Sequence, residues 1–340
     1  MTIQNTLQNR RAFLKHRPSG RMPVLDDFGV ESVAIDEVPA GHVVVKVDTV
    51  SIDAWIRTTL DSAGMHEMSD LGETIRAFGV GQVVASESST LAVGDWAFGM
   101  MCAQTHALLP DGACSKLSLE DGIRPADFVG ALGITTGLTA WVGLIRVGEV
   151  KAGDVVVVSG AAGAVGSVVV QLAKARGARV IGIAGGPDKC RYLTEVLGAD
   201  AAIDYKNADV AGQLAAAAPN GVDVFFDNVG GELLDVVLDK LAPAGARVVI
   251  CGAISQYQHL DDVRGPKLYL RLAERNASMR GFVVTYHMAD FAEATREMSD
   301  LLRAGKLTLP EHVVAGIDQF PEAMLLLFNG GSTGNLVVRP

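Results

Sequence analysis

The sequence predicts an α/β protein in which a doubly wound parallel sheet is combined with a second, β-rich domain. Four consecutive valines, Val155–Val158, indicate a strand buried on both faces, because a half-exposed strand would alternate apolar and polar residues. From Ala131 to about Leu307 strands alternate with helices, which is typical of a parallel sheet. Before residue 130 strand signals dominate and helix signals are few, which favours a barrel-like β domain.

The strand patterns divide the chain into three stretches. Residues 1–130 form the β-rich domain, with strand patterns at 43–50, 79–85 and 95–98. Residues 131–308 form the α/β domain, with candidate strands at 155–158, 179–184, 223–226, 247–251 and about 278–284. Residues 309–340 end in a short strand at 334–339 and are expected to complete the first domain. No low-complexity linker separates the stretches, so we expect tight packing, with the site in the cleft between the domains.

A glycine-rich turn follows the buried valine strand. Gly160, Gly163 and Gly166 precede an apolar helix at 167–176. Glycines allow a tight turn and a close approach to a pyrophosphate, and the helix N-terminus offers N–H groups and partial positive charge to that anion. Strand, glycine turn and helix together indicate the phosphate-binding start of a dinucleotide-binding (Rossmann) fold.

The end of the next strand indicates which dinucleotide binds. An NAD-binding fold normally places Asp or Glu there to bind the ribose hydroxyls. Here Gly185 and Gly186 leave that space open and Lys189 follows, which provides room and a cation for a ribose phosphate. We therefore predict NADP(H) rather than NAD(H). Arg191 is a further candidate for the phosphate, and Asp188 is either a helix N-cap, which we favour, or a displaced ribose ligand.

Composition and charge exclude several classes of protein. A chain of 340 residues is long enough for two domains, and its net charge of −10 disfavours a nucleic-acid partner. The polar N-terminus has no signal-peptide pattern, and no apolar run approaches a membrane span. The four cysteines have no metal-ligand spacing, so we expect free thiols in a reducing cytosol and a cytoplasmic protein: Cys102, Cys114, Cys190 and Cys251.

Two further strands end in glycine and polar residues. The strand at 223–226 runs into Asp227-Asn-Val-Gly-Gly-Glu232, and the strand at 247–251 runs into the segment 252–257. Ligands bind beyond the carboxyl ends of parallel strands, so both ends are candidate contacts for a ribose and a nicotinamide. Ordinary strand-end turn chemistry explains such a pattern as well.

These motifs resemble the zinc-independent branch of the medium-chain dehydrogenase/reductase superfamily. Within it the chain is similar to the prostaglandin reductase (leukotriene B4 dehydrogenase) family and its bacterial curcumin-reductase-like members. The resemblance covers nearly the whole chain, is densest from 131–141 through Tyr257, and recurs at 281–284 and 334–336. It implies a Rossmann domain plus a GroES-like β-rich domain, an NADPH-dependent reductase of α,β-unsaturated ketones and aldehydes, and a homodimer.

The resemblance also implies individual cofactor contacts. Lys189 and Tyr205 look like the pair that holds the ribose phosphate, Asn228 like a further nucleotide contact, and Asn335 like a late contact from the C-terminal strand. The turn that looks like the pyrophosphate site consists of Ala161, Ala162, Gly163 and Ala164. The segments that look like the nicotinamide half of the site consist of Cys251, Gly252, Ala253, Ile254, Ser255 and Tyr257, together with Phe282, Val283 and Val284.

Tyr257 occupies the position whose hydroxyl faces the nicotinamide ribose and the substrate in the family. We predict that this hydroxyl and the cofactor's own ribose hydroxyl donate hydrogen bonds to the enolate oxygen that forms when hydride reaches the β-carbon. A proton then returns to the α-carbon from water or through a tyrosine. Tyr286 is a second candidate near the substrate, although a packed aromatic near the domain interface fits its position equally well.

The departures from the family concern the substrate domain. The family's Asp-Pro-Tyr-Met-Arg is replaced by Asp53-Ala-Trp-Ile-Arg57, so Trp55 keeps an aromatic that lines the substrate pocket but loses its hydroxyl. The family's tryptophan-containing segment is not obvious at 100–106. These differences put the identity of the substrate in doubt more than the type of reaction.

Gly64-Met65-His66-Glu67 resembles the Gly-His-Glu of zinc alcohol dehydrogenases in the same superfamily. No cysteine precedes His66, where those enzymes place their first ligand, so we expect no metal and a polar residue near the pocket mouth.

A quinone oxidoreductase of the same superfamily and a non-catalytic NADPH-binding protein are alternative functions. The charged loop from Tyr257 to Leu272 is either a lid or a solvated excursion.

Overall fold

The computed structural model describes residues 2–61, 66–207 and 209–340, which form two compact units. Unit 1 consists of Met1–Gly130, His259–Asp261 and Glu311–Pro340, and unit 2 consists of Ala131–Gln258 and Asp262–Pro310. Unit 2 has a parallel sheet with helices, and unit 1 has mostly antiparallel sheets. The predicted combination of an α/β domain and a β-rich domain is therefore confirmed.

The described part of unit 2 contains a six-stranded parallel sheet in the order β10-β9-β8-β11-β12-β13. The strand order reverses beside β8, between β9 and β11, which is where open α/β sheets bind ligands. All four residues of β11 are buried, so the sheet is covered on both faces there. The strands are β8 Val155–Ser159, β9 Arg179–Ala184, β10 Ala201–Asp204, β11 Val224–Asp227, β12 Arg247–Ile250 and β13 Ser278–Gly281.

Helices connect these strands, and several are short or interrupted by 3₁₀ and π turns. The longest described helices of unit 2 are α2 Ala164–Ala175 and α7 Phe291–Arg303. The others are α1 Thr139–Trp141, α3 Pro187–Arg191, α4 Val210–Ala217, α5 Gly231–Leu238 and α6 Leu270–Glu274. No helix in the described part of the chain is long and apolar enough to cross a membrane.

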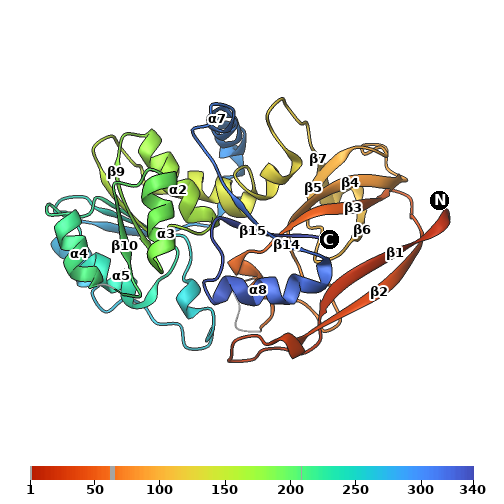
Figure 1. The fold of residues 1–340 in the computed structure, drawn as a ribbon, viewed down its shortest axis with the longest axis horizontal. Coiled ribbons are helices and arrows are strands. Elements are labelled where there is room, and N and C mark those ends of the chain that lie inside the picture. The colour runs from red at the N-terminus through yellow and green to blue at the C-terminus, as the bar shows by residue number, and fades with distance from the viewer. Residues whose placement is uncertain (1, 62–65, 208) are drawn as a thin grey trace. The chain divides into compact units, whose positions relative to one another are not determined.

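Unit 1 is built from both ends of the chain (Figure 1). Its described residues form a seven-stranded sheet in the order β14-β15-β3-β4-β5-β7, with β6 paired to β3, and a separate antiparallel ribbon of β1 and β2. These strands are β1 Thr2–Leu14, β2 Phe28–Glu37, β3 His42–Ser51, β4 Gly79–Ser86, β5 Trp96–Gly99, β6 His106–Pro110, β7 Cys114–Lys116, β14 Glu311–Ala315 and β15 Asn335–Arg339. Helix α8, Phe320–Phe328, lies between the last two strands in sequence.

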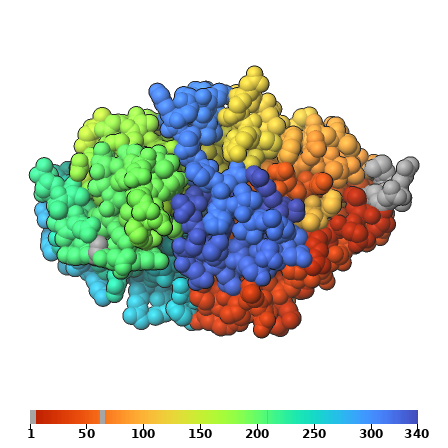
Figure 2. Space-filling view, in the orientation of Figure 1, coloured from red at the N-terminus to blue at the C-terminus, as the bar shows by residue number. Residues whose placement is uncertain are grey.

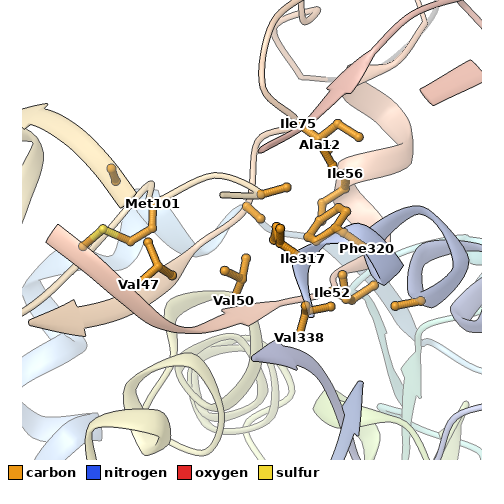
Figure 3. Packing of buried hydrophobic residues seen from close by; sticks show 14 of the residues in the cluster. Ala12, Val47, Val50, Ile52, Ile56, Ile75, Met101, Ile317, Phe320 and Val338 are labelled. Atoms are coloured by element: carbon orange, nitrogen blue, oxygen red, sulfur yellow. The ribbon is translucent and has the colours of Figure 1, made fainter. Parts of the chain in front are cut away.

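The core of unit 1 joins these distant segments. Figure 3 shows Ile317 and Phe320 of the C-terminal segment packed with Ile56 and Ile52 from the start of the chain. Phe320 and Ile56 are both fully buried. Strand β15 pairs antiparallel with β3 through Val337 and Ser51, so the C-terminal stretch completes the sheet as well as the core.

The structure differs from the predicted elements at several places. The strand expected at 278–284 ends at Gly281, because Val284–Asp290 turns into a 3₁₀ helix. Strand β10 was not predicted, and neither were β1, β2, β6, β7 and β14. Strand β10 is only four residues long, and β2 is partly exposed along much of its length, so neither has a strong apolar pattern.

Candidate active site

The glycine turn after β8 has three glycines in three different environments. Gly160 has a φ of +57°, a left-handed conformation that favours glycine. A Cβ on Gly166 would lie 2.4 Å from the Gly160 carbonyl oxygen, so a glycine there lets α2 pack onto the turn. A Cβ on Gly163 would meet only that oxygen, at 3.3 Å, which leaves its outer side open. This arrangement fits the tight turn, helix packing and open approach that a pyrophosphate site requires.

Helix α2 begins directly after this turn, with Gly163 as its N-cap. Ala161 and Ala162 are buried beneath it, and Ala164 is the first helical residue. The first N–H groups of a helix have no partner within it, and the first turn of α2, which is fully described, carries no acidic side chain. The predicted pyrophosphate residues are therefore brought together at a helix N-terminus whose charge suits an anion.

The predicted ribose-phosphate residues lie around the end of β9. A Cβ on Gly185 would lie 2.9 Å from Tyr205 Cε1 and 2.9 Å from Lys206 Cε, so both side chains cover this glycine. Tyr205 is held there because its N–H donates to the Ala184 carbonyl at 3.1 Å, and it is 51% exposed. This stretch of unit 2, drawn in green, lies at the surface in Figure 2.

Lys189 faces a second cation. Its partial burial lowers the pKa of its ammonium below the ordinary value of 10.5, and the charge of Lys206 lowers it further. A Cβ on the neighbouring Gly186 would meet no atom within 4 Å, and two ammonium groups that repel each other beside such an open position favour a bound anion. Sequence reasoning singled out Lys189 and missed Lys206, although Lys206 directly follows Tyr205 and repeats the positive charge.

The favoured role of Asp188 as a helix N-cap is wrong. The N-cap of α3 is Gly186, and Pro187 takes the first helical position, where its missing N–H costs nothing. Asp188 therefore lies inside the first turn, where its carboxylate pairs with the Arg191 guanidinium. Both side chains of this pair are largely exposed.

A hydrogen-bonded cluster joins the carboxyl ends of β8 and β11. The Ser159 hydroxyl donates to Asp227 at 2.7 Å and accepts from the Asn228 N–H at 2.8 Å. The Asn228 side-chain amide donates to the Ser159 carbonyl at 2.7 Å. Asn228 is therefore oriented by the protein itself, and its role as a nucleotide contact stays a prediction. Sequence reasoning missed Ser159, for which the only signal was a polar residue at the end of an apolar strand.

Asp227 is an acid with 0% exposure at the centre of this cluster. Burial raises the pKa of its carboxyl above the ordinary value of 3.8, and donors from Val229, Gly230 and Ser159 oppose that rise. Its backbone carbonyl accepts from the N–H groups of Cys251 at 2.8 Å and Gly252 at 3.2 Å. The residue thus ties the end of β11 to the segment that follows β12.

Tyr257 folds back over that segment. The Ala253 N–H donates to the Tyr257 hydroxyl at 3.3 Å, and a Cβ on Gly252 would lie 3.0 Å from the same oxygen. The segment can turn in this way because Ile254–Gln256 forms one 3₁₀ turn, and the Ser255 hydroxyl donates to the Val229 carbonyl at 2.6 Å. The Tyr257 side chain is 8% exposed, and burial raises its pKa above the ordinary value of 10. Near neutral pH the hydroxyl therefore keeps its proton and can donate it in a hydrogen bond.

The cysteines are free, and none is poised as a nucleophile. Burial raises the pKa of the Cys251 thiol to about 12 and that of Cys102 to about 11. Burial also raises the pKa values of Cys114 and Cys190. A protonated thiol is a weak nucleophile, so Cys251 serves this segment through its backbone and not through thiol chemistry.

The segment after β13 brings one predicted residue toward the sheet and leaves others exposed. A Cβ on Gly143 would lie 2.7 Å from Phe282 Cζ and 2.7 Å from Phe226 Cε2, so Phe282 packs beside a strand residue. Val283 is exposed and Val284 is partly buried. Tyr286 is 89% exposed, so its alternative interpretation as a packed aromatic is wrong.

Within unit 1, Trp55 lies in the 3₁₀ helix Ala54–Thr59. Its ring centroid is 5.6 Å from that of His66 and 5.9 Å from that of Phe78. Gly64 and Met65 of the Gly-Met-His-Glu motif lie outside the described residues. Trp55 and His66 therefore belong to one cluster, and their place in a substrate pocket stays a prediction.

Asn335 is also in unit 1 and is 1% exposed. Its side-chain amide donates to the Val129 carbonyl at 3.1 Å. Its carbonyl oxygen, Oδ1, is buried and finds no hydrogen-bond partner among the residues that the structure describes. A buried acceptor without a partner is costly, which fits the prediction that this residue meets a ligand.

Metal ligands were not expected. Within 2–61, 66–207 and 209–340, the structure contains no group of three or more His, Cys, Asp or Glu side chains that could hold a metal ion. The absence of a catalytic metal stays a prediction.

Comparison with known proteins identifies the family. Residues 164–300 match the family model described as zinc-binding dehydrogenase, and residues 10–117 match the one described as the N-terminal domain of oxidoreductase. An NADPH-dependent curcumin reductase of Escherichia coli is 33% identical over 99% of this chain and 98% of its own. The chain belongs to the medium-chain dehydrogenase/reductase family.

Two further medium-chain dehydrogenase/reductase comparisons agree with the motifs. An NADP⁺-dependent 2-alkenal reductase of Nicotiana tabacum is 32% identical over 98% of this chain and 97% of its own. The crystal structure of CurA from Vibrio vulnificus in complex with NADPH superposes with a TM-score of 0.90 at 34% identity, covering 97% of this chain and 98% of that one. The resemblance to curcumin-reductase-like members of the medium-chain dehydrogenase/reductase family is therefore confirmed.

Proposed function

We propose that the protein is an NADPH-dependent reductase of the carbon–carbon double bond in α,β-unsaturated ketones and aldehydes. The observation that carries this proposal is the buried, protonated Tyr257 hydroxyl, held beside the segment that follows β12. The strand order of the same sheet reverses beside β8, the strand that leads into the glycine turn. The relatives named curcumin reductase and 2-alkenal reductase support the choice of substrate class.

We assign the cofactor contacts within unit 2 to three places. The N-terminus of α2 and the turn before it bind the pyrophosphate, because they offer N–H groups and a glycine-lined approach. Lys189, Tyr205 and Lys206 bind the ribose phosphate, because the two lysines bring neighbouring positive charges to the end of β9, where a Cβ on Gly186 would meet no atom within 4 Å. The segment 251–257 lines the nicotinamide half. The solved NADPH complex of CurA supports this choice of cofactor.

When bound, NADPH would supply the hydride for the β-carbon of the substrate. The protein then has to stabilise the negative charge that develops on the carbonyl oxygen. The Tyr257 hydroxyl already accepts from the Ala253 N–H, so its own proton is left to donate to that oxygen. Because the hydroxyl is buried and fixed before the substrate binds, little reorganisation is needed in the transition state.

The experiment that tests this function measures NADPH oxidation with an α,β-unsaturated ketone or aldehyde. Parallel assays use NADH, the saturated analogue and a quinone. We expect rapid oxidation of NADPH with the unsaturated carbonyl compound, and slow oxidation with the saturated analogue and with NADH. Faster turnover of the quinone would favour a quinone oxidoreductase. Tight NADPH binding without turnover of any acceptor would favour a non-catalytic protein.

We also propose that the protein forms a homodimer through the edge of the parallel sheet. Strand β13 is the last strand of the sheet and three of its four residues are exposed. Exposed apolar side chains continue this edge: Met279, Val283, Tyr286 and Met288. An uncovered edge with apolar neighbours favours pairing with a second copy.

Light scattering should give the mass of a dimer, and the double variant Met279→Glu, Met288→Glu should shift the measured mass toward that of the monomer. A wild-type mass of 35.6 kDa would contradict this proposal.

A further inference from the structure

A chain of two hydrogen bonds in unit 1 fixes the tautomer of His66. Thr58 Oγ1 lies 2.7 Å from the Trp55 carbonyl oxygen and 2.5 Å from His66 Nδ1. A carbonyl oxygen can only accept, so the single hydroxyl proton of Thr58 is donated to Trp55. Toward His66 the hydroxyl must therefore accept, which places a proton on Nδ1 and leaves Nε2 with a lone pair when the ring is neutral.

The ring is neutral at physiological pH. Partial burial lowers the pKa of His66 below its ordinary value of 6.5, because the charged imidazolium loses hydration there. His66 nonetheless remains exposed in part. Its Nε2 is thus a fixed hydrogen-bond acceptor, while its Nδ1 is already used.

The surroundings of this acceptor are aromatic. The His66 ring packs against Trp55, Trp55 contacts Phe78, and Phe78 stacks on Phe98 with centroids 5.5 Å apart. Each of these residues is at least partly exposed, so we infer that the four rings form an accessible aromatic wall. The Trp55 Nε1 donor is buried and has no hydrogen-bond partner among the described residues. Ligand sites commonly combine such apolar walls with a few fixed polar groups.

We propose that His66 is a substrate-specificity residue that accepts a hydrogen bond from a hydroxyl group of the substrate. The protein would then prefer α,β-unsaturated carbonyl compounds that carry a hydroxyl, because that hydroxyl donates to Nε2 while the conjugated body lies on the aromatic wall. Thr58 is a positioning residue, since it holds the ring and selects its tautomer. This inference rests on the proposed function and adds the substrate class to it.

The test compares a hydroxylated α,β-unsaturated ketone with its methyl ether, which cannot donate a hydrogen bond. The measured quantity is the ratio of the two kcat/KM values. For the wild type we expect a ratio above one. His66→Phe keeps an aromatic ring but removes the acceptor, so it should lower the ratio about three- to tenfold, the usual effect of one hydrogen bond. His42→Phe, in β3 of the same unit, is the matched control and should keep the wild-type ratio.

Variants of Thr58 separate positioning from folding. Thr58→Val keeps the shape of the side chain but cannot accept a hydrogen bond from Nδ1–H, so it should lower the ratio of the two kcat/KM values. Thr58→Ser keeps the hydroxyl and should keep the wild-type ratio. Nitrogen-15 NMR of the imidazole reads the tautomer without any substrate. The wild type and Thr58→Ser should show the Nδ1–H form, and Thr58→Val should lose this preference.

The outcomes separate this inference from the proposed function. If all forms reduce both ketones with the same ratio, the role of His66 is overturned and the reductase activity stands. A neutral Nε2–H tautomer in the wild type also overturns the inference, whatever the activity. If no form reduces either ketone although NADPH binds, the proposed function fails and the substrate preference fails with it.

Discussion

The Ser159 hydroxyl donates a hydrogen bond of 2.7 Å to the buried carboxylate of Asp227. The two residues lie at the carboxyl ends of β8 and β11, beside the place where the strand order reverses. The same carboxylate accepts from the N–H groups of Val229 and Gly230. One buried acid therefore holds two strand ends and the turn that follows, which keeps the expected cofactor contacts at fixed positions.

Asp227 should give the protein a distinct dependence of stability on pH. Burial raises the folded-state pKa of its carboxyl above the ordinary 3.8, so the folded protein holds this proton more tightly than the unfolded chain. The contribution of Asp227 to the stability of the fold is most favourable at low pH. It is lost as the pH rises from the pKa of this carboxyl in the unfolded chain through its pKa in the folded protein. Asp227→Asn cannot titrate. The free energy of unfolding of the wild type minus that of the variant should therefore fall with rising pH and then level off.

Urea unfolding of both forms at a series of pH values from 4 upward measures this difference. Asp188→Asn, at a largely exposed carboxylate, is a suitable control. A difference that increases with pH would contradict the raised pKa of Asp227.

The glycines of the turn should respond differently to alanine. Gly166→Ala places a Cβ 2.4 Å from the Gly160 carbonyl oxygen and 2.7 Å from Ala161 Cα, both backbone atoms that cannot move easily. We expect a loss of about 1–3 kcal/mol in the free energy of unfolding, as for other overpacked sites. In Gly163→Ala the new Cβ would lie 3.3 Å from the Gly160 carbonyl oxygen and near no other atom, so the free energy of unfolding should hardly change. Chemical unfolding measures both, and equal losses would contradict the packing role of Gly166.

The two lysines should distinguish NADPH from NADH. Lys189→Ala and Lys206→Ala each remove one of two neighbouring cations, and a charge-assisted hydrogen bond to a phosphate is worth about 1.5–3 kcal/mol. NADPH affinity should therefore fall about ten- to a hundredfold in each variant, while NADH affinity stays nearly constant. Nucleotide fluorescence titration measures both dissociation constants. Lys174→Ala, whose ammonium pairs with Asp200 at 2.8 Å, is the control. Equal losses for the two nucleotides would refute the assignment.

Tyr257→Phe should impair turnover without impairing NADPH binding. The variant removes the buried hydroxyl that we expect to donate to the substrate oxygen and keeps the packed ring. Loss of one such donor lowers kcat about a hundredfold or more. Steady-state kinetics and NADPH titration check the two halves of this prediction, with the exposed Tyr269→Phe as a control. Unchanged turnover would remove Tyr257 from the mechanism.

The fold was predictable where a strand is buried on both faces. The valine run at Val155–Val158 predicted β8 because such a strand excludes polar residues. The ribbon of β1 and β2 was missed because many of its residues are exposed or only partly buried, so its sequence keeps polar residues and lacks a clear alternation. Strand β10 was missed because its four residues are too few to show a period.

The candidate site was predictable where its residues are contiguous in the sequence. The glycine turn and the segment 251–257 are motifs of that kind. Ser159 and Asp227 are 68 residues apart, and only the pairing of β8 with β11 brings them together. The chain of bonds from Trp55 through Thr58 to His66 likewise depends on the direction of side chains, which no residue pattern specifies.

Strand β15, at Asn335–Arg339, pairs with β3, at His42–Ser51, and this pairing has a consequence for synthesis on the ribosome. All of unit 2 lies between these strands in the sequence, so β3 emerges long before its partner. At ordinary rates of translation the delay is about 15 to 60 s. During that time the apolar side of β3 stays exposed to solvent, because Phe320, which packs in the same core, has not yet been synthesised. The first strands of the nascent chain are therefore natural clients for chaperones, and unit 2 has time to fold before unit 1 can close.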